Sequence, residues 1–464
     1  MFRISAGGLV RRMHKAKTGI KPINVLPLGF VAVIVTGALL LMLPISSKDG
    51  TSLPFLSALF TATSATCVTG LVVVDTGTYF SLFGQIVIIL LIQLGGLGLM
   101  TISMILFSLT GRRISLHDRM SIAEGLGESR LQGVVRLARA ALLVTGMIEL
   151  TGAMLLSFRF IPQYGIIKGL WFSVFHSISA FCNAGFDLIG GYRSFTGYSH
   201  DPYMLLVVMF LIISGGLGFG VILNLRATRD LRRLRLHSKL VLTGTIFLIV
   251  FGMLAFLWIE YENPKTIGNM NLFDKIVNSM FQSVTLRTAG FNTFDQLSMY
   301  DASKGVGILL MLVGGGPAGT AGGLKITTVF TLLLAARAYI RGTFETEAFR
   351  RTIPLEQVRR ALTITLLGGL FLLGMATMLS FSEQDMPAGS MGLVNQLYES
   401  TSAFCTVGVS TGVTAAGSSV TRVILILLMY AGRIGLITVA VSLVESTTRK
   451  EAVLHYPTEE ILIG

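Results

Sequence analysis

Charged side chains are scarce in this sequence: Asp, Glu, Lys and Arg make up 13% of its 464 residues, whereas hydrophobic types make up 52%. A typical soluble domain carries about 25% charged residues, so water cannot be the solvent for most of this surface. Metal-binding signatures are also missing, because the six histidines and three cysteines show no H-E-x-x-H or C-x-x-C spacing. The composition excludes an ordinary soluble globule and favours a helical bundle embedded in lipid.

Apolar runs of membrane-spanning length recur along the chain. A transmembrane helix needs about 20 predominantly apolar residues, and we identify eight such runs. They cover residues 22–44, 85–109, 140–158, 203–223, 241–258, 305–334, 362–381 and 423–444. The first follows basic residues, as in a signal peptide, but it is too long for a signal sequence and has no A-x-A-like site. We therefore expect it to remain in the mature protein.

Basic residues are concentrated in every second connection between these runs. They cluster in segments 3–21, 112–139, 226–239, 337–360 and 449–450, whereas the other connections carry more acidic than basic side chains. Because positive residues stay on the cytoplasmic side, we predict a multi-pass protein of the plasma (inner) membrane with both termini in the cytoplasm. The net charge of +13 is then a topology signal, and no nucleic acid is needed to explain it.

Short, half-polar runs lie in the outward-facing connections, at 54–66, 170–181, 273–286 and 394–404. At about 1.5 Å per residue, each reaches only about half-way through the hydrocarbon core, so it can enter the membrane but not cross it. Each run ends in a tetrapeptide closed by glycine. The four are Cys67-Val68-Thr69-Gly70, Cys182-Asn183-Ala184-Gly185, Arg287-Thr288-Ala289-Gly290 and Cys405-Thr406-Val407-Gly408. This recurrence indicates a fourfold internal repeat.

The predicted fold is an all-α polytopic membrane protein. Its eight transmembrane helices would form four pseudo-symmetric helix–pore helix–helix repeats around a central ion pore. The expected units are a cytoplasmic tail 1–21, repeats 22–113, 136–227, 239–342 and 358–446, and a cytoplasmic tail 447–464.

The glycine turns are candidates for a cation site. Irregular backbone at membrane depth is tolerated only inside protein or along a water-filled cavity, and a ring of backbone carbonyls can replace the water shell of a cation. A strand whose successive carbonyls all point at the axis of the ring needs glycine, which adopts backbone angles that residues with a β-carbon rarely reach. The candidate ligands are Val68, Thr69, Gly70, Asn183, Ala184, Gly185, Thr288, Ala289, Gly290, Thr406, Val407 and Gly408. The alternative is close helix packing through small residues.

The second apolar run of the third repeat is interrupted. It contains Gly314, Gly315, Gly316, Pro317, Gly319, Gly322 and Gly323. Six glycines and a proline would cost a helix roughly 9 kcal/mol, so we predict a non-helical loop at 314–323, just beneath the glycine turns. The alternative is a glycine-rich helix contact.

Two basic residues lie in apolar surroundings near this loop, where charge is expensive. Arg433 could hold the loop through its carbonyls, set an electrostatic barrier, or form an ion pair that only fastens two helices. Lys325 could act in the same way or extend to the cytoplasmic face.

Other polar residues have weaker assignments. Arg287 is expected behind the third glycine turn, with Glu399 as a possible counter-charge, and Glu149 as a buried polar tie between helices. The three cysteines share one repeat position, which marks the register and does not indicate disulfides.

These motifs resemble those of the Ktr/Trk/HKT superfamily of potassium transporters, and most of all the membrane subunit of the bacterial Ktr system. The resemblance rests on the four glycine turns and on the glycine-containing segments 95–98, 215–218 and 432–435. The short segment before the first run favours Ktr over Trk. The resemblance implies potassium uptake with no enzymatic step, an intramembrane gating loop associated with the last-span arginine, and sodium as a candidate activator. It also implies a homodimer with 455–464 at its contact and a cytoplasmic nucleotide-binding ring of the KtrA type.

Several alternatives stay open. A sodium-selective relative would share this architecture, although glycine at all four turns favours potassium. A secondary transporter of an organic solute also uses broken helices, but many such folds have inverted repeats. The G-x-S-x-G match at 408–412 has no preceding strand and already contains the fourth glycine turn, so it does not indicate a hydrolase.

Overall fold

The computed structural model describes residues 22–98, 134–228, 230–343, 345–383 and 392–435. The expected tails 1–21 and 447–464 lie outside these residues, as do the ends of the second and eighth apolar runs. The described chain is helical apart from one antiparallel hairpin, in which β1 (Thr346–Ala348) pairs with β2 (Arg351–Ile353).

The helices follow one another in a recurring order. The first quarter contains α2 (Pro22–Met42), η1 (Pro44–Ser46), α3 (Phe55–Thr66), α4 (Thr76–Tyr79) and α5 (Leu82–Leu97). The second contains α8 (Val134–Tyr164), α9 (Ile166–Phe181), η2 (Thr196–Tyr198), α10 (Pro202–Gly216), α11 (Phe219–Thr228) and η3 (Leu231–Arg233). The third contains α12 (Leu236–Ile259), α13 (Leu272–Thr285), α14 (Asp301–Leu312) and α15 (Ile326–Ile340). The fourth contains α16 (Leu355–Ser382), α17 (Leu393–Phe404), α18 (Val413–Ala416) and α19 (Ser419–Ile434).

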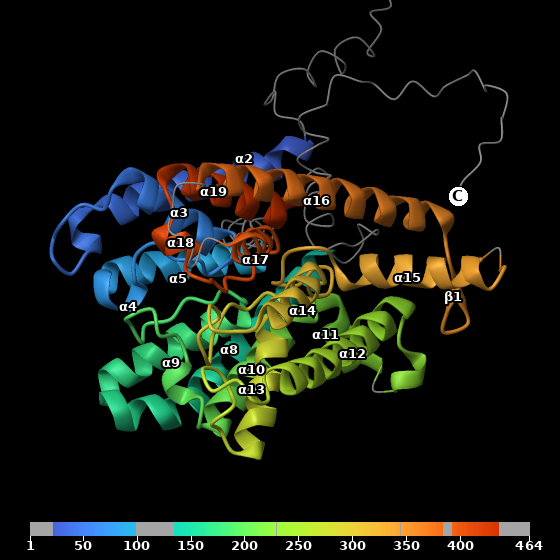
Figure 1. Ribbon diagram of the computed structural model, residues 1–464, viewed down its shortest axis with the longest axis horizontal. Helices are drawn as coiled ribbons and strands as arrows, with labels where there is room; N and C mark the ends of the chain where they lie inside the picture. Colours follow the sequence, from blue (N-terminus) through green and yellow to red (C-terminus); the bar gives the residue numbers. More distant parts are fainter. Residues whose placement is uncertain (1–21, 99–133, 229, 344, 384–391, 436–464) are drawn as a thin grey trace, which may run out of the picture.

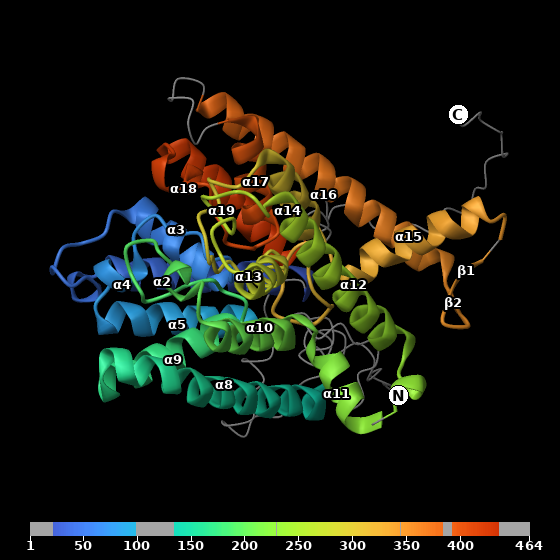
Figure 2. The same cartoon turned by 60° about the horizontal axis from the view of Figure 1, so that its bottom comes forward.

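In each quarter a helix of 12 to 16 residues (α3, α9, α13 or α17) follows a longer one and ends at a non-helical segment. These segments gather in the middle of the bundle in both views (Figures 1 and 2). Helices α15 and α16 run out from the body side by side, with the β-hairpin at their far end (Figure 1).

Length and composition identify three described helices that could cross a membrane, within α8, α12 and α16, or four if α10 and α11 form one span bent by 95°. Two reasons account for the difference from the eight expected runs. Helices α2, α5 and α19 lie at the edges of the described residues, so part of their apolar sequence is not counted. Helices α10 and α14 each stop at a glycine-containing segment, which divides an apolar run into two shorter pieces.

Local sequence signals explain where the second helix of a quarter begins. Ser81, Asp201 and Ser418 stand before α5, α10 and α19, and their side chains accept a hydrogen bond from a backbone N–H in the first turn of the helix. Such N-caps satisfy donors that have no partner within the helix. Pro202 adds a residue whose fixed φ suits the first helical position.

Glycine allows these second helices to touch the ends of the short ones. A β-carbon at Gly95, Gly215 or Gly432 would overlap the carbonyl oxygen of Thr66, Phe181 or Phe404, respectively. The final residues of α3, α9 and α17 are therefore held against the second helix of their own quarter at a distance that only glycine permits.

Gly432→Ala should destabilise the protein by about 1–3 kcal/mol, because the added methyl group has no space beside Phe404. Thermal unfolding of the purified protein in detergent measures the effect. Gly374→Ala is the matched control, since no atom lies within 4 Å of its β-carbon position, and it should be neutral or stabilise by up to about 1 kcal/mol. Equal melting temperatures for the two variants would contradict this account of the packing.

Candidate functional site

The four glycine turns predicted from the sequence lie together. A β-carbon at Gly70 would lie 2.5 Å from Ala184 O, one at Gly185 would lie 2.8 Å from Ala289 O, and one at Gly290 would lie 2.5 Å from Val407 O. A β-carbon at Gly408 would overlap Thr69 O, which closes the circle. The turns are therefore arranged as a ring in chain order, with the first opposite the third and the second opposite the fourth.

The backbone of each turn has the same alternation. The glycines have φ values of +97°, +68°, +83° and +95°. The residues two positions earlier also have positive φ: Val68 (58°), Asn183 (59°), Thr288 (76°) and Thr406 (52°). Positive φ is uncommon outside glycine. Backbone that alternates between left-handed and right-handed conformations directs successive N–H groups to one side of the turn and the carbonyl groups to the opposite side.

The N–H groups of the turns are bound by the short helices behind them. Thr69, Ala184 and Val407 donate to the carbonyls of Ser64, Ser179 and Ser402 at 2.8, 2.7 and 2.8 Å, and Ala289 donates to Thr285 O at 2.8 Å. Among the described residues, no hydrogen bond is made to any carbonyl oxygen of the twelve candidate ligands. Buried carbonyls normally have a partner, so this ring is equipped to coordinate a cation.

Serine hydroxyl groups and one buried apolar residue per turn also hold the glycine turns in place. Ser64 Oγ and Ser402 Oγ accept from the N–H of Gly70 and Gly408, each at 3.1 Å. The residues that follow the four glycines are all buried: Leu71, Phe186, Phe291 and Val409. Each turn is thus held both by hydrogen bonds and by an apolar anchor in the core.

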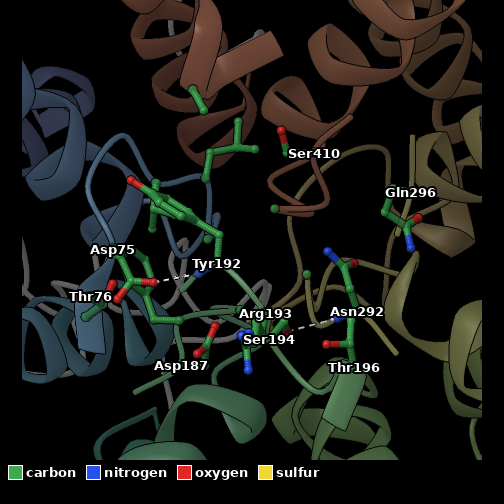
Figure 3. A pocket seen from close by; sticks show the side chains of 18 of the residues that line it. Asp75, Thr76, Asp187, Tyr192, Arg193, Ser194, Thr196, Asn292, Gln296 and Ser410 are labelled. Carbon is green, nitrogen blue, oxygen red and sulfur yellow. Dashed lines mark hydrogen bonds between the residues drawn. The ribbon is translucent and has the colours of Figure 1, made fainter. Parts of the chain in front are cut away.

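A cavity of about 420 Å³ opens on the ring and is lined by all four glycines. Figure 3 shows its polar wall, with Asp75 and Asp187 on one side and Asn292 and Gln296 on the other. Asp75 accepts a hydrogen bond from Tyr192 N at 2.7 Å. Arg193 also lines the cavity, and among the described residues it forms no ion pair.

The predicted loop lies between α14 and α15. Its residues Gly316 and Thr320 donate to Gly216 O (2.8 Å) and Gly215 O (3.3 Å) at the end of α10. Thr320 Oγ1 donates to Phe181 O (3.2 Å), and a β-carbon at Gly322 would overlap the Thr406 side chain. The loop therefore contacts the bases of the second and fourth glycine turns.

Arg433 joins this loop to the first quarter. Its guanidinium donates to Thr320 O in the loop and to Gly95 O in α5. None of its contacts within the described part of the chain is with a carboxylate, so the ion-pair alternative has no support in this geometry. Lys325 follows the loop, and its Nζ donates to the carbonyl oxygen of Ala321 in the loop at 2.5 Å.

The weaker assignments have mixed outcomes. Arg287 is buried, with 7% exposed, and donates to Thr245 Oγ1 at 3.3 Å. Glu399 does not contact it and instead binds the segment after Gly408. Glu149 accepts from Gln93 at 3.1 Å and so ties α8 to α5. Two further polar residues are not singled out by the sequence pattern. His176 accepts a hydrogen bond from Leu188 N, after the second turn, and Thr320 of the loop donates to Phe181 O; the position of each relative to the glycines is the available signal.

A family model described as "TrkH: Cation transport protein" matches residues 14–450. The chain belongs to this family. It is 41% identical over 443 residues to Ktr system potassium uptake protein B of Bacillus subtilis (strain 168). The aligned residues cover 96% of this chain and 97% of that protein. It is also 39% identical over 450 residues to potassium/sodium uptake protein NtpJ of Enterococcus hirae, and that alignment covers 97% of this chain and 99% of NtpJ.

A solved structure shares the fold. The crystal structure of the potassium transporter TrkH from Vibrio parahaemolyticus matches with a TM-score of 0.71 at 16% identity, covering 93% of this chain and 86% of that chain. The resemblance to the Ktr/Trk/HKT superfamily is confirmed, and the polytopic membrane fold with it. Membership of a cation transport family also agrees with the expectation that the chain is not an enzyme.

The pH dependence of cation uptake should follow Asp187. Burial, with a smaller effect of the Asp75 carboxylate, raises the pKa of Asp187 to about 6. Protonation below that pH removes a negative charge from the cavity above the ring, whose other charged groups include Asp75, Asp295 and Arg193. Uptake from dilute cation should therefore be weaker at a pH near 5 than at a pH near 7.5.

Asp187→Asn should make uptake low and nearly independent of pH over this range. Asp49→Asn, at an exposed loop position outside the cavity, should keep the wild-type profile. Initial rates at low cation concentration, measured across the pH range in whole cells, provide the comparison. A wild-type profile in Asp187→Asn would show that this carboxylate does not influence entry.

Proposed function

We propose that this chain is the ion-translocating subunit of a Ktr-like system for potassium uptake across the plasma membrane. The observation that carries the proposal is the closed ring of four glycine turns whose carbonyls accept no hydrogen bond from the described residues. The names of three relatives point in the same direction, since each is a potassium or potassium/sodium uptake protein.

The proposed architecture has eight membrane spans in four repeats, 22–113, 136–227, 239–342 and 358–446, with both termini cytoplasmic. The recurring helix order and the shared backbone angles of the turns support it. In this arrangement α3, α9, α13 and α17 are pore helices that enter from outside and end at the filter. Their C-terminal ends carry partial negative charge and favour a cation on the axis.

Selectivity comes from the carbonyls of the twelve ligand residues, 68–70, 183–185, 288–290 and 406–408. These oxygens replace the hydration shell of potassium, and no covalent step occurs. Ions move down their electrochemical gradient, to which an inside-negative potential contributes about 2.3 kcal/mol per charge for each 100 mV.

The loop 314–323 is the proposed gate. It contacts the bases of two turns, and Arg433 holds it closed by bridging Thr320 O and Gly95 O. Opening then requires the guanidinium to release one of two carbonyls, and each charge-assisted hydrogen bond of this kind is stronger than a neutral one.

The assembly is a homodimer in which each protomer has its own pore, regulated by a KtrA-type nucleotide-binding ring. The name "Ktr system" in the relatives supports a multi-subunit assembly, and the basic cytoplasmic connections offer a surface for an acidic partner or anionic lipid. The proposed dimer contact at 455–464 lies outside the described residues. Sodium is proposed as an activator and not as the main substrate.

A second candidate function is combined potassium and sodium uptake. Its support is the 39% identity to NtpJ, whose name includes both ions. No observation on this chain favours transport of an organic solute.

Gly290→Ser tests the filter. A β-carbon there would lie 2.5 Å from Val407 O, and the φ of +83° is strained for serine. We expect discrimination of potassium against sodium to fall at least about tenfold, in line with the cost of overpacking and strain. Growth of a potassium-uptake-deficient bacterium on limiting potassium, with and without added sodium, is the assay.

The matched control for the filter test is Gly305→Ser, at an open position on α14 of the same repeat. It should support wild-type growth. If Gly290→Ser also grows like the wild type in both media, the filter assignment is wrong.

Arg433→Gln tests the gate. Losing the charged contacts to Thr320 O and Gly95 O should free the loop and raise basal potassium flux into proteoliposomes by about tenfold. Arg422→Gln is the control, because Arg422 lies on the same helix but donates to Ser57 Oγ at 3.5 Å, away from the loop. Reduced or unchanged flux in Arg433→Gln, with correct insertion, would contradict a closing role.

A further inference from the structure

Glu399 is a fully buried carboxylate at a position that the filter proposal does not use. It lies on α17, nine residues before Gly408, with 0% of its surface exposed. It accepts hydrogen bonds from Ser410 Oγ (2.7 Å), Thr411 N (2.9 Å), Thr411 Oγ1 (3.3 Å), Thr414 N (3.1 Å) and Thr414 Oγ1. All five donors belong to the segment that leaves the fourth glycine turn.

The contacts around Glu399 suit an ionised carboxylate. Two of the five partners are backbone N–H groups, which can only donate, and the two carboxyl oxygens accept every bond. Within the described residues, no lysine or arginine forms an ion pair or hydrogen bond with Glu399. A negative charge at Glu399 is therefore stabilised by dipoles and is not neutralised by a basic side chain.

The charge lies close to the ring. Ser402 is one helical turn further along α17, on the same face as Glu399. Its hydroxyl accepts from Gly408 N (3.1 Å) and donates to Val409 O (2.7 Å). Gly408 and Ser410 both line the cavity above the ring. Residues 408–414 are thus bound to two successive turns of one helix, with the carboxylate at the outer one.

The opposite quarter has a neutral counterpart. His176 lies nine residues before Gly185 and is fully buried. Its Nε2 accepts from Leu188 N at 3.2 Å, and its Nδ1 lies 2.7 Å from Phe172 O. Because one nitrogen accepts from an N–H and the other faces a carbonyl, the ring is the neutral tautomer with its proton on Nδ1.

In the other two quarters the residue nine positions before the glycine makes no side-chain hydrogen bond to the segment after the turn, although in the third quarter the neighbouring Gln282 bonds Gln296 at 2.7 Å. Thr61 occupies the corresponding position in α3 and donates to Ser57 O of its own helix. Phe281 occupies it in α13 and has no polar group. Among the described residues, a titratable side chain at this position binds the segment after the turn in the second and fourth quarters, whose turns face each other across the ring: a carboxyl group in one and a neutral imidazole in the other.

We propose that Glu399 is a positioning residue for ion selectivity, which holds the outer end of the fourth filter segment and places a fixed negative charge beside the outermost ion site. The inference rests on the proposed function of the ring. Discrimination between cations of different size requires carbonyls held at fixed distances, or a fixed field at the site. Glu399 supplies both at one turn, and His176 supplies only the first at the opposite turn.

Glu399→Gln is the main test, because it keeps the size of the side chain and replaces one acceptor by an amide that faces donors. We expect the sodium concentration that halves potassium uptake to fall about tenfold, as for the loss of a hydrogen bond to a charged group. The Michaelis constant for potassium should rise more than the maximal rate falls. Glu399→Asp keeps the charge and should retain more discrimination than the glutamine variant.

Glu383→Gln is the matched control. Glu383 is also a buried glutamate of the fourth quarter, and it accepts from Ser418 N and Thr421 Oγ1 at the start of α19, away from the ring. The Glu383→Gln variant should leave the competition between potassium and sodium unchanged, even if it lowers the amount of protein expressed. All variants are measured as the full chain in the membrane, with uptake normalised to the inserted protein.

The outcomes separate the two proposals. If the wild type shows no potassium-selective uptake, the proposed function fails. If the wild type is selective and Glu399→Gln changes only the amount of protein or the maximal rate, Glu399 is a structural brace and this inference is overturned. If Glu399→Gln does not insert, Thr414→Val removes one hydroxyl donor and should shift the competition in the same direction, by a smaller factor; an unchanged competition would also overturn the inference.

Discussion

The structure depends on the close approach of four stretches of backbone. At the ring, each glycine lies so near the carbonyl of the next turn that a β-carbon would overlap it or approach within 2.5–2.8 Å. Such close approach of one backbone to the next leaves no space for a side chain, and the surrounding helices must hold the turns in place. The hydrogen bonds from the short helices, and the buried residue after each glycine, provide that support.

The same use of glycine extends beneath the ring. Gly95, Gly215 and Gly432 hold the second helices against the ends of the short ones, and the loop of the third quarter packs its glycines against α10 and the fourth turn. Arg433 connects this loop to α5 through carbonyl oxygens alone. The ring, the loop and the helix contacts are therefore continuous through packed backbone, so a shift of the loop changes contacts at the base of the turns.

Much of this arrangement follows from local sequence. The short helices α3 and α17 match the runs predicted at 54–66 and 394–404, and the break between α14 and α15 contains the predicted loop. Apolar length, N-caps and glycine content act over a few residues, so they can be recognised without the fold. The partner of Glu399 could not be recognised in this way, and the suggested pairing with Arg287 is absent from the described contacts.

The sequence by itself determined that the chain enters a membrane and where its glycine turns lie, and it predicted four related units. Tertiary structure alone decided that the turns form a closed ring, that Arg433 meets Thr320 and Gly95, and that Glu399 braces the fourth turn and not the third. The physical reason is that helix and turn signals depend on neighbouring residues. Hydrogen bonds between distant segments depend on how packed helices direct their side chains, which no local pattern encodes.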